Sequence, residues 1–304
     1  MSLLTLYTWP KSFADDHIAR IQRNAVRSWL LLDPKPCILV FGDEPGVKEY
    51  CDEFGLTRVS EAMEVIDGTV RIRDMAVVAE TLSATRFYCF INADIILTNS
   101  LIQALPAISS TFERFLLGAS PWNVNITEDL RYEPGWEEVL EKRARGENDL
   151  RPRVSSDFFL YPKGYLASAP DLIIGRPYID NGLMWYTRKR GDPLIDASTG
   201  VFTVHQNHHY KHFGEKADRK GETSGALFNV KAVGGRGRLY TWANATDHYL
   251  KDGLHPYWAG RICRWSTHAT QGSRASKVFN QLIWKTAAIA SRPARKVFKL
   301  VNPR

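Results

Sequence analysis

The stretch RFYCFINADIILTNS, Arg86–Ser100, is the part of the chain that decides the fold. Its aromatic and aliphatic residues are typical of a strand that is covered on both faces, as in a parallel sheet. Asn92 and Asp94 nevertheless stand in the middle of the run. Because an ionised carboxylate in apolar surroundings is costly unless a partner compensates for it, we expect Asp94 to lie near a strand end, where it can reach one.

The segments before this stretch alternate between strands and helices. Apolar runs at 3–8 and 37–43 indicate strands, helical patterns at 46–55 and 70–84 indicate helices, and Ser12 is the expected N-cap of the first helix. This order favours right-handed βαβ units and therefore an α/β fold with a mostly parallel, Rossmann-like sheet flanked by helices. In such sheets ligands bind beyond the carboxyl ends of the strands.

The second half of the 304-residue chain shows a weaker alternation. The length is sufficient for a large core, and 44% hydrophobic with 24% charged residues is the composition of a globular protein rather than a disordered one. The expected elements are a helix at 134–149, strands at 155–164 and 201–210, a helix at 180–191 with Asp180 as its N-cap, and a loop at 213–238.

The net charge of +7 is concentrated at the C-terminus. Residues 261–304 contain ten Lys or Arg and no Asp or Glu, so residues 1–260 carry a net charge of −3. Apolar residues at helical spacing in this tail predict a basic amphipathic segment that lies on an anionic membrane surface, or else packs on the catalytic domain with its lysines solvated. The acidic body argues against a nucleic-acid partner.

The compartment is predicted from three further features. The four cysteines form no CxxC pair, the N-terminus lacks the basic region of a signal peptide, and no segment approaches the roughly 20 apolar residues that span a bilayer. We therefore expect a cytoplasmic protein that is peripheral on the inner face of the membrane if the tail binds lipid.

Two groups of residues could bind a metal ion. Asn92 and Asp94 offer hard oxygen ligands for Mg²⁺ or Mn²⁺, and in an extended segment their spacing places both on one side; alternatively, they only cap the turn after the strand. The histidines of TVHQNHHYKH form the second group. Because strand alternation places His205 and His208 on opposite faces, we expect one ligand from this strand, His205.

Asp157 and Asp180 are candidate catalytic carboxylates, since each stands beside aromatic residues. A carboxylate in a partly dry cleft can accept a proton or bind a sugar hydroxyl. Asp180 has the alternative role of a helix N-cap.

The motifs FINADIIL, SSDFFLYPKG, IGRPYIDNGLMW and TVHQNHHY occur in an order that resembles a family of glycosyltransferase-like proteins from bacteria and plants. That family has the nucleotide-diphospho-sugar transferase fold, GT-A. The likeness extends from about Leu3 to Tyr210. It implies a GT-A domain at 1–260, with a nucleotide-sugar-binding half at 1–115 and an acceptor half at 116–260, followed by the basic segment 261–304.

The resemblance implies a hexosyltransferase that moves a sugar from a UDP- or GDP-linked donor to a hydroxyl of a glycan or glycoconjugate, as in polysaccharide synthesis. Asp94 with Asn92 would form the site for Mn²⁺ or Mg²⁺ and the diphosphate, and His205 would complete the metal shell. Asp157 and Asp180 would face the acceptor, with Asp180 the first choice of base if the reaction inverts the anomeric centre. The nucleotide would lie at Thr8, Gly42, Asp43, Arg73 and Asp74.

The chain departs from the family at two places. The family commonly reads W-D-N-W where this chain has Tyr178-Ile179-Asp180-Asn181-Gly182, and it has Asp where this chain has His209, so the aromatic residue beside Asp180 and a possible carboxylate ligand are missing. Two other functions remain open. A metal-dependent hydrolase would use the cluster His205–His212, and a non-catalytic membrane or nucleic-acid adaptor would use the tail.

Overall fold

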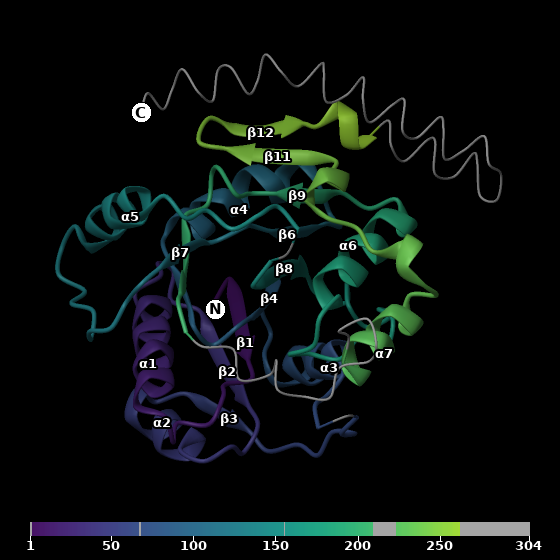
Figure 1. Ribbon diagram of the computed structural model, residues 1–304. Coiled ribbons are helices and arrows are strands. Elements are labelled where there is room, and N and C mark those ends of the chain that lie inside the picture. The colour runs from purple at the N-terminus through teal and green to yellow at the C-terminus, as the bar shows by residue number, and fades with distance from the viewer. Residues whose placement is uncertain (1, 67, 155, 209–222, 262–304) are drawn as a thin grey trace.

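The computed structural model describes residues 2–66, 68–154, 156–208 and 223–261. Within these residues the strands build two sheets (Figure 1). The strands are β1 (Leu4–Thr8), β2 (Cys37–Phe41), β3 (Thr57–Val59), β4 (Phe87–Ile91), β5 (Ile95–Leu97), β6 (Leu116–Gly118), β7 (Trp122–Val124), β8 (Phe158–Pro162), β9 (Leu194–Asp196), β10 (Thr203–Gln206), β11 (Asp247–Leu250) and β12 (Gly253–Pro256).

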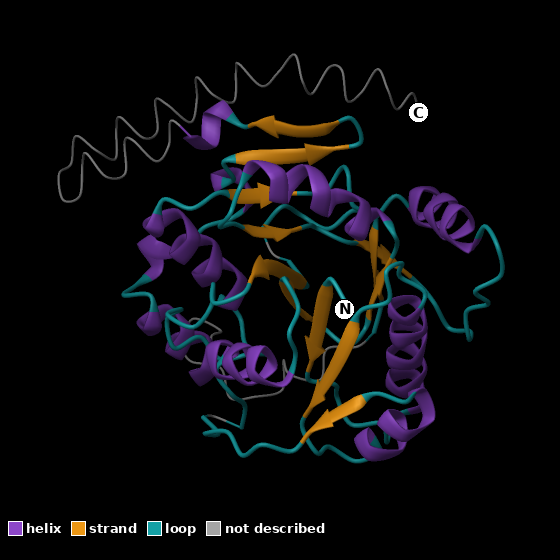
Figure 2. Cartoon of the chain, turned by 180° about the vertical axis from the view of Figure 1, so that it is seen from behind, coloured by secondary structure: helices purple, strands orange, loops and turns teal. Residues whose placement is uncertain are grey.

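The larger sheet has nine strands in the order β12-β11-β9-β6-β8-β4-β1-β2-β3. Its pairs are parallel except that β8 runs antiparallel to β4 and β6, and β12 runs antiparallel to β11. The smaller sheet has the order β5-β10-β7. The expected α/β class, with a mostly parallel sheet flanked by helices, is confirmed (Figure 2).

Helices cover both faces of the large sheet. Residues of α1, α2 and α4 join one hydrophobic core, and residues of α3, α6 and α7 join the core on the opposite face. In Figure 1, α1 and α2 lie to the left of the central strands and α3, α6 and α7 to the right. The helices are α1 (Asp16–Leu30), α2 (Val47–Phe54), α3 (Ile72–Leu82), α4 (Ser100–Thr111), α5 (Trp136–Glu147), α6 (Ile179–Arg190) and α7 (Ser224–Ala232), with short 3₁₀ turns η2 (Arg236–Arg238) and η3 (Trp242–Asn244).

Helix α1 packs against both the large sheet and the small one. Ile21, Ala25 and Trp29 are buried at helical spacing, and the indole N–H of Trp29 donates to the backbone oxygen of Ile95 in β5 at 2.8 Å. The expected N-cap, Ser12, is wrong: the cap is Asp15, whose carboxylate accepts from the backbone N–H groups of His17 and Ile18. The helix therefore begins one turn later than the sequence indicates.

Two expectations for the second half also need correction. Asp180 is not the N-cap of α6, because the helix begins at Ile179 after Tyr178, whose φ of 72° is left-handed. The segment 213–238 is not a loop throughout, since α7 and η2 lie within it. Residues 209–222 lie outside the described part of the chain.

The basic segment beyond Arg261 also lies outside the described residues, so its proposed membrane contact and the boundary near residue 260 stay predictions. The division at residue 115 stays a prediction as well. Among the described helices, none is long and apolar enough to span a bilayer.

Candidate active site

The residues Asn92, Ala93 and Asp94 form the turn by which the chain leaves the large sheet and enters the small one. The backbone N–H of Ile95, the first residue of β5, donates to the oxygen of Asn92 at 3.2 Å and closes this turn. The expectation of an extended segment with both side chains on one side is therefore wrong. Asp94 points to His205 of β10 and to His208 beyond it, whereas the amide of Asn92 donates to Asp157.

His205 reaches the site because β10 pairs antiparallel with β5. In this register His205 lies opposite Ile95, next to Asp94, although 110 residues of chain separate the two. His208 reaches the same carboxylate from beyond the strand, since β10 ends at Gln206. The expectation that alternation keeps His208 apart from His205 is wrong, because alternation stops where the strand does.

Asp94, His205 and His208 form the only described group of three or more His, Cys, Asp or Glu side chains with donor atoms close enough to share a metal ion. Nε2 of His208 lies 2.8 Å and Nε2 of His205 lies 3.8 Å from Oδ2 of Asp94. The three side chains are 10%, 3% and 1% exposed for Asp94, His205 and His208. The cluster therefore lies at the floor of the site, shielded from bulk water.

This donor set fits a divalent cation. Donors at right angles around one ion with bonds of about 2.1 Å are about 3 Å apart, which agrees with the 2.8 and 3.8 Å separations. Oδ1 of Asp94 is buried and has no hydrogen-bond partner among the described residues. A buried anionic oxygen of this kind is costly unless a cation or donor compensates for it.

The protonation states also favour metal binding. Burial alone would raise the pKa of Asp94, but the hydrogen bond from His208 and the positive potential of His205 and Lys11 hold that pKa well below its ordinary value. Burial lowers the pKa of His205, and the charge of Asp94 only partly opposes this. The site thus presents an ionised carboxylate and a neutral imidazole, the forms that bind metals.

Lys11 adds a positive charge beside this cluster. Its Nζ lies 3.2 Å from Nε2 of His208, and burial lowers its pKa while Asp94 and Asp157 raise it. The side chain of Gln22 holds the Lys11 backbone at both its N–H and its oxygen, at 2.7 and 3.0 Å. The amine therefore lies beside the cluster of Asp94, His205 and His208, on a backbone that Gln22 fixes.

Asp157 lies directly before β8 and joins the metal cluster to the second half of the site. Nδ2 of Asn92 donates to its Oδ1 at 2.9 Å, and the guanidinium of Arg151 binds its Oδ2. The backbone N–H of Asn92 also donates to the oxygen of Asp157 at 2.9 Å. Both carboxylate oxygens of Asp157 are thus already occupied.

Asp180 is a carboxyl group whose pKa is raised. It is half-buried in the first turn of α6, and its Oδ2 accepts from the backbone N–H of Ser156 at 3.2 Å. Burial and the negative charge of Asp157 raise the pKa of Asp180 to about 7, although Ser156 and Arg151 oppose the shift. A carboxyl group with this pKa can accept a proton near neutral pH.

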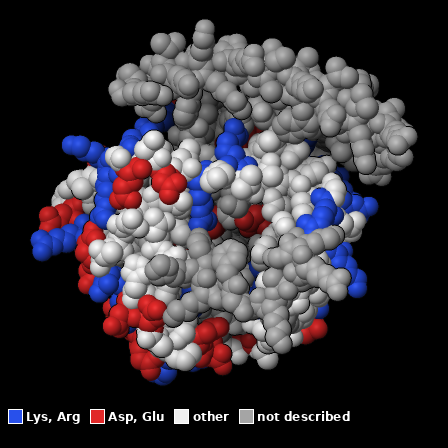
Figure 3. All heavy atoms as spheres, viewed as in Figure 1, with Lys and Arg blue, Asp and Glu red and all other residues white. Residues whose placement is uncertain are grey.

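The face seen in Figure 3 is hollowed near its centre. Acidic atoms lie inside the hollow, and Lys and Arg side chains flank it. Such an arrangement of charges suits a site that binds a cation at its floor and anionic groups at its rim.

Three of the expected nucleotide positions lie at one sheet edge. Thr8 ends β1, and Gly42 and Asp43 follow β2, which runs parallel to β1, so these residues share the edge at which β4 ends. Thr8 is buried and its Oγ1 has no hydrogen-bond partner among the described residues. Asp43 is exposed, and the positive φ of Gly42 brings its Cα against Trp9.

The other two expected positions, Arg73 and Asp74, lie in the first turn of α3. Nη1 of Arg73 binds Oδ1 of Asp171 at 2.5 Å, and Asp74 binds Arg71 at 3.3 Å. They pair with charges around them rather than with the metal cluster, and no described contact joins them to Asp94.

Comparison with known proteins finds partial structural similarity only. No family model matches the chain, and no curated protein matches it by sequence. Among solved structures, S. aureus TarS 1-349 in complex with UDP-GlcNAc superposes with a TM-score of 0.44 and 12% identity over 70% of this chain, which spans only 60% of that chain. The glucosyl-3-phosphoglycerate synthase of Mycobacterium tuberculosis, in complex with Mn²⁺, uridine-diphosphate and phosphoglyceric acid, superposes with a TM-score of 0.47 and 14% identity over 77% of this chain and 80% of that one.

Sequence reasoning missed Lys11, Arg151 and the role of His208. His208 belonged to a visible histidine cluster, but the end of β10 was not visible. Lys11 and Arg151 stand in irregular segments without a motif, so no signal in the sequence marks them. At Gly182 an added Cβ would lie 2.8 Å from the side chain of Leu172, so a larger residue fits there only if Leu172 moves.

Proposed function

We propose that the chain is a metal-dependent glycosyltransferase of GT-A architecture, which transfers a sugar from a nucleotide-sugar donor to an acceptor hydroxyl. The observation that carries the proposal is the convergence of Asp94, His205 and His208 at the carboxyl edge of a mostly parallel sheet, directly beside the pair Asp157 and Asp180. Ligands bind at this edge in sheets of this kind.

Asp94, His205 and His208 would hold the metal ion. Two imidazole nitrogens favour Mn²⁺ over Mg²⁺, because Mg²⁺ prefers oxygen ligands throughout. A bound ion supplies charge neutralisation for the diphosphate that leaves the sugar. Asn92 would then act through Asp157 rather than as a ligand.

Lys11, next to His208, would assist the departure of the diphosphate with its positive charge. An ammonium group already positioned in a partly dry site stabilises developing negative charge without further reorganisation. Because Gln22 fixes the Lys11 backbone, the amine needs only side-chain rotation to reach a phosphate oxygen.

Asp180 is the proposed base for an inverting transfer. Its carboxylate accepts the proton of the acceptor hydroxyl, the acceptor oxygen forms a bond to the anomeric carbon, and the bond from that carbon to the diphosphate breaks with its electron pair on the diphosphate. Asp157 is the second choice, since its carboxylate already forms an ion pair with Arg151 and accepts a hydrogen bond from Asn92. If the reaction retains the anomeric configuration, neither need be a base.

The donor and the acceptor are proposed by class. The donor is a UDP- or GDP-linked hexose whose nucleotide lies along Thr8, Gly42 and Asp43, with Arg73 and Asp74 farther along the same edge. The acceptor is a glycan or glycoconjugate, as in polysaccharide synthesis. We further propose that the protein works in the cytoplasm, at the membrane surface if the segment 261–304 binds anionic lipid.

A thermal-shift panel of nucleoside diphosphates, with Mn²⁺ and with chelator, tests this function. A ligand at 100 times its Kd that binds only the folded protein stabilises it by about 2.7 kcal/mol, which should raise the Tm by several degrees. We expect one diphosphate to do so in the presence of Mn²⁺ and not with chelator. The absence of a response to every nucleotide would count against the transferase.

A zinc-dependent hydrolase is the second candidate, because two histidines and one aspartate also form a common zinc site. It predicts one Zn²⁺ per chain that survives dialysis without nucleotide, and no stabilisation by diphosphates. Metal analysis after dialysis, together with the panel above, separates the two functions.

A further inference from the structure

Gln206 stands between His205 and His208 in the sequence and makes three buried hydrogen bonds. It is fully buried at the end of β10. Its Nε2 donates to the backbone oxygens of Ile21 at 2.7 Å and Asp94 at 3.0 Å, and its Oε1 accepts from Nδ2 of Asn24 at 3.1 Å. Both N–H groups of the amide are therefore used, one of them on the residue that supplies the carboxylate ligand.

Asn24 fixes the orientation of this amide. It is itself fully buried in α1, and its Nδ2 also donates to the oxygen of Glu128 at 3.1 Å while its Oδ1 accepts from the N–H of Leu130 at 3.0 Å. The O and N atoms of Gln206 are thus assigned by their partners, since Asn24 donates on one side and two carbonyls accept on the other. The amide has one orientation that satisfies every group.

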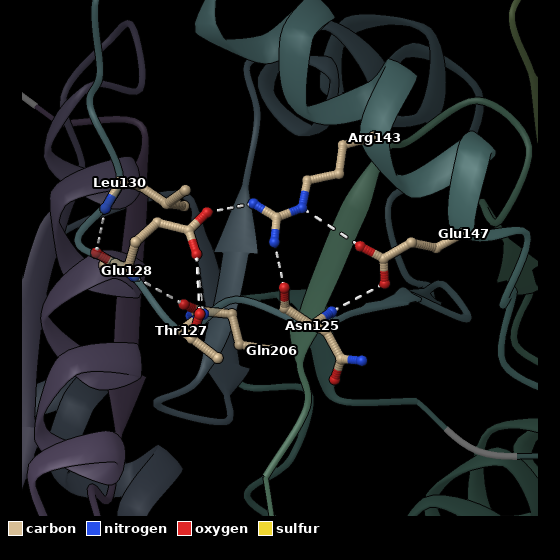
Figure 4. Close-up of polar contacts among 8 residues, drawn as sticks. Asn125, Thr127, Glu128, Leu130, Arg143, Glu147 and Gln206 are labelled. Carbon is tan, nitrogen blue, oxygen red and sulfur yellow. Dashed lines mark hydrogen bonds and ion pairs between the residues drawn. The ribbon is translucent and has the colours of Figure 1, made fainter.

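The loop that Asn24 contacts is held in turn by α5 (Figure 4). The guanidinium of Arg143 binds the Glu128 carboxylate and the backbone oxygen of Asn125, and its Nε lies 3.3 Å from Glu147. Glu147 accepts from the N–H of Asn125 at 2.9 Å. A connected set of polar contacts therefore runs from α5 through the loop to Asn24 and Gln206.

We propose that Gln206 is a positioning residue of the metal site, which sets the distance between the carboxylate ligand of Asp94 and the imidazoles of His205 and His208. The inference rests on the proposed function, in that these three side chains bind Mn²⁺. Gln206 is one residue from His205, two from His208, and bonded to the backbone of Asp94. One side chain thus fixes both segments that supply ligands.

The pairing of β10 with β5 does not by itself fix the positions of Asp94 and His208. The ladder fixes His205 against Ile95, but His208 lies beyond the last paired residue, and Asp94 lies in the turn before β5. Both flanks depend on side-chain contacts, and Gln206 supplies a hydrogen bond from β10 to the backbone of the turn. Residues that orient metal ligands in this way change metal affinity about 10- to 100-fold when they are replaced.

The test is Mn²⁺ affinity of the full chain, measured from the electron paramagnetic resonance signal of free Mn²⁺ without nucleotide. Gln206→Leu keeps the size of the side chain and removes its donors from the carbonyls of Ile21 and Asp94. We expect affinity to fall about 10-fold or more. The visible absorption of bound Co²⁺ should change as well, since it reports the ligand geometry.

Asn229→Leu is the matched control. Asn229 is also a fully buried amide that bridges two segments, accepting from the N–H of Ile173 at 2.8 Å and donating to the oxygens of Ile173 and Pro177 at 3.1 and 3.0 Å. No described contact joins it to the metal cluster. It should lose thermal stability as Gln206→Leu does, yet bind Mn²⁺ like the wild type.

Each outcome decides something different. Unchanged Mn²⁺ affinity in Gln206→Leu, with a wild type that binds Mn²⁺, overturns the positioning role and leaves the proposed function intact. A wild type that binds no Mn²⁺ overturns both, because the site itself then fails. If Gln206→Leu does not fold, Asn24→Ala replaces it. This variant removes the hydrogen bonds of Asn24 to Gln206, Glu128 and Leu130 but leaves the donors of Gln206 on Ile21 and Asp94, so it should weaken Mn²⁺ binding in the same direction by a smaller factor.

Discussion

Replacement of Asp94 by asparagine should lower Mn²⁺ affinity by more than about 100-fold. This exceeds the loss expected when a residue that only orients the ligands is replaced. Asp94 is the only carboxylate in the described metal cluster, so Asp94→Asn removes the one negative charge that compensates the cation. The variant should fold, because the amide keeps the size of the side chain and a carbonyl oxygen for His208 to donate to.

The control for this prediction is Asp52→Asn. Asp52 is an exposed residue of α2 that pairs only with Lys48 among its described contacts, so the same chemical change there should leave Mn²⁺ affinity as it is in the wild type. Titration of both variants with Mn²⁺ checks the prediction. Equal affinity of Asp94→Asn and the wild type would return Asp94 to the role of a turn residue.

Replacement of Asp180 by asparagine should lower the rate of an inverting transfer by about 10²- to 10⁴-fold, the usual contribution of a general base. Because burial and the charge of Asp157 raise the pKa of Asp180 to about 7, the wild-type rate should increase with pH through neutrality as the carboxyl ionises. The pH dependence of the initial rate of donor consumption checks both statements.

Asp157→Asn distinguishes the two candidate bases. If Asp180 is the base, this variant stays active, and the rise of its rate shifts to lower pH because the repulsion from Asp157 is gone. If Asp157 is the base, the variant loses activity at every pH and Asp180→Asn retains it. That second result would reverse the assignment.

The raised pKa of Asp180 also lowers the stability of the folded protein at neutral pH. The folded protein keeps the Asp180 proton up to about pH 7, whereas the unfolded chain releases it near the ordinary value of 3.8, so this group destabilises the fold progressively from about pH 4 to pH 7. Asp180→Asn should therefore raise the Tm above pH 7 and leave it nearly unchanged at pH 4. Melting curves at the two pH values measure this effect independently of activity.

The fold class could be predicted because its signals are local and strong. The apolar runs of β1, β2 and β4 are typical of a sheet covered on both faces, and the helix expected at 134–149 is found as α5 at Trp136–Glu147. Each of these elements is specified by residues close together in the sequence, so no knowledge of tertiary contacts was needed.

The small sheet could not be predicted in the same way. β5 has three residues and pairs with β10 across more than 100 residues of chain, a contact that no local pattern specifies. The end of β10 at Gln206 then decides that His208 joins His205, which alternation alone excludes. The misplaced N-caps have a similar cause, since Ser12 and Asp15 are both good caps and only the three-dimensional structure chooses between them.

The fold brings partners to the carboxylate of Asp94. Its Oδ2 faces His208 and His205, and Lys11 lies nearby, although none of the three is near Asp94 in sequence. The sequence indicated that Asp94 needs a partner but not which one, because the partners come from β10 and from the segment after β1.

The most direct measurement is a calorimetric titration of the nucleoside diphosphate found in the thermal-shift panel. It is titrated into the wild type with Mn²⁺, the wild type with chelator, and Asp94→Asn with Mn²⁺. If Asp94 holds a metal ion that the diphosphate needs, the wild type with Mn²⁺ should bind the diphosphate measurably. The wild type with chelator and Asp94→Asn should bind it at least about 100-fold more weakly. Equal binding in all three would contradict the metal-dependent donor site.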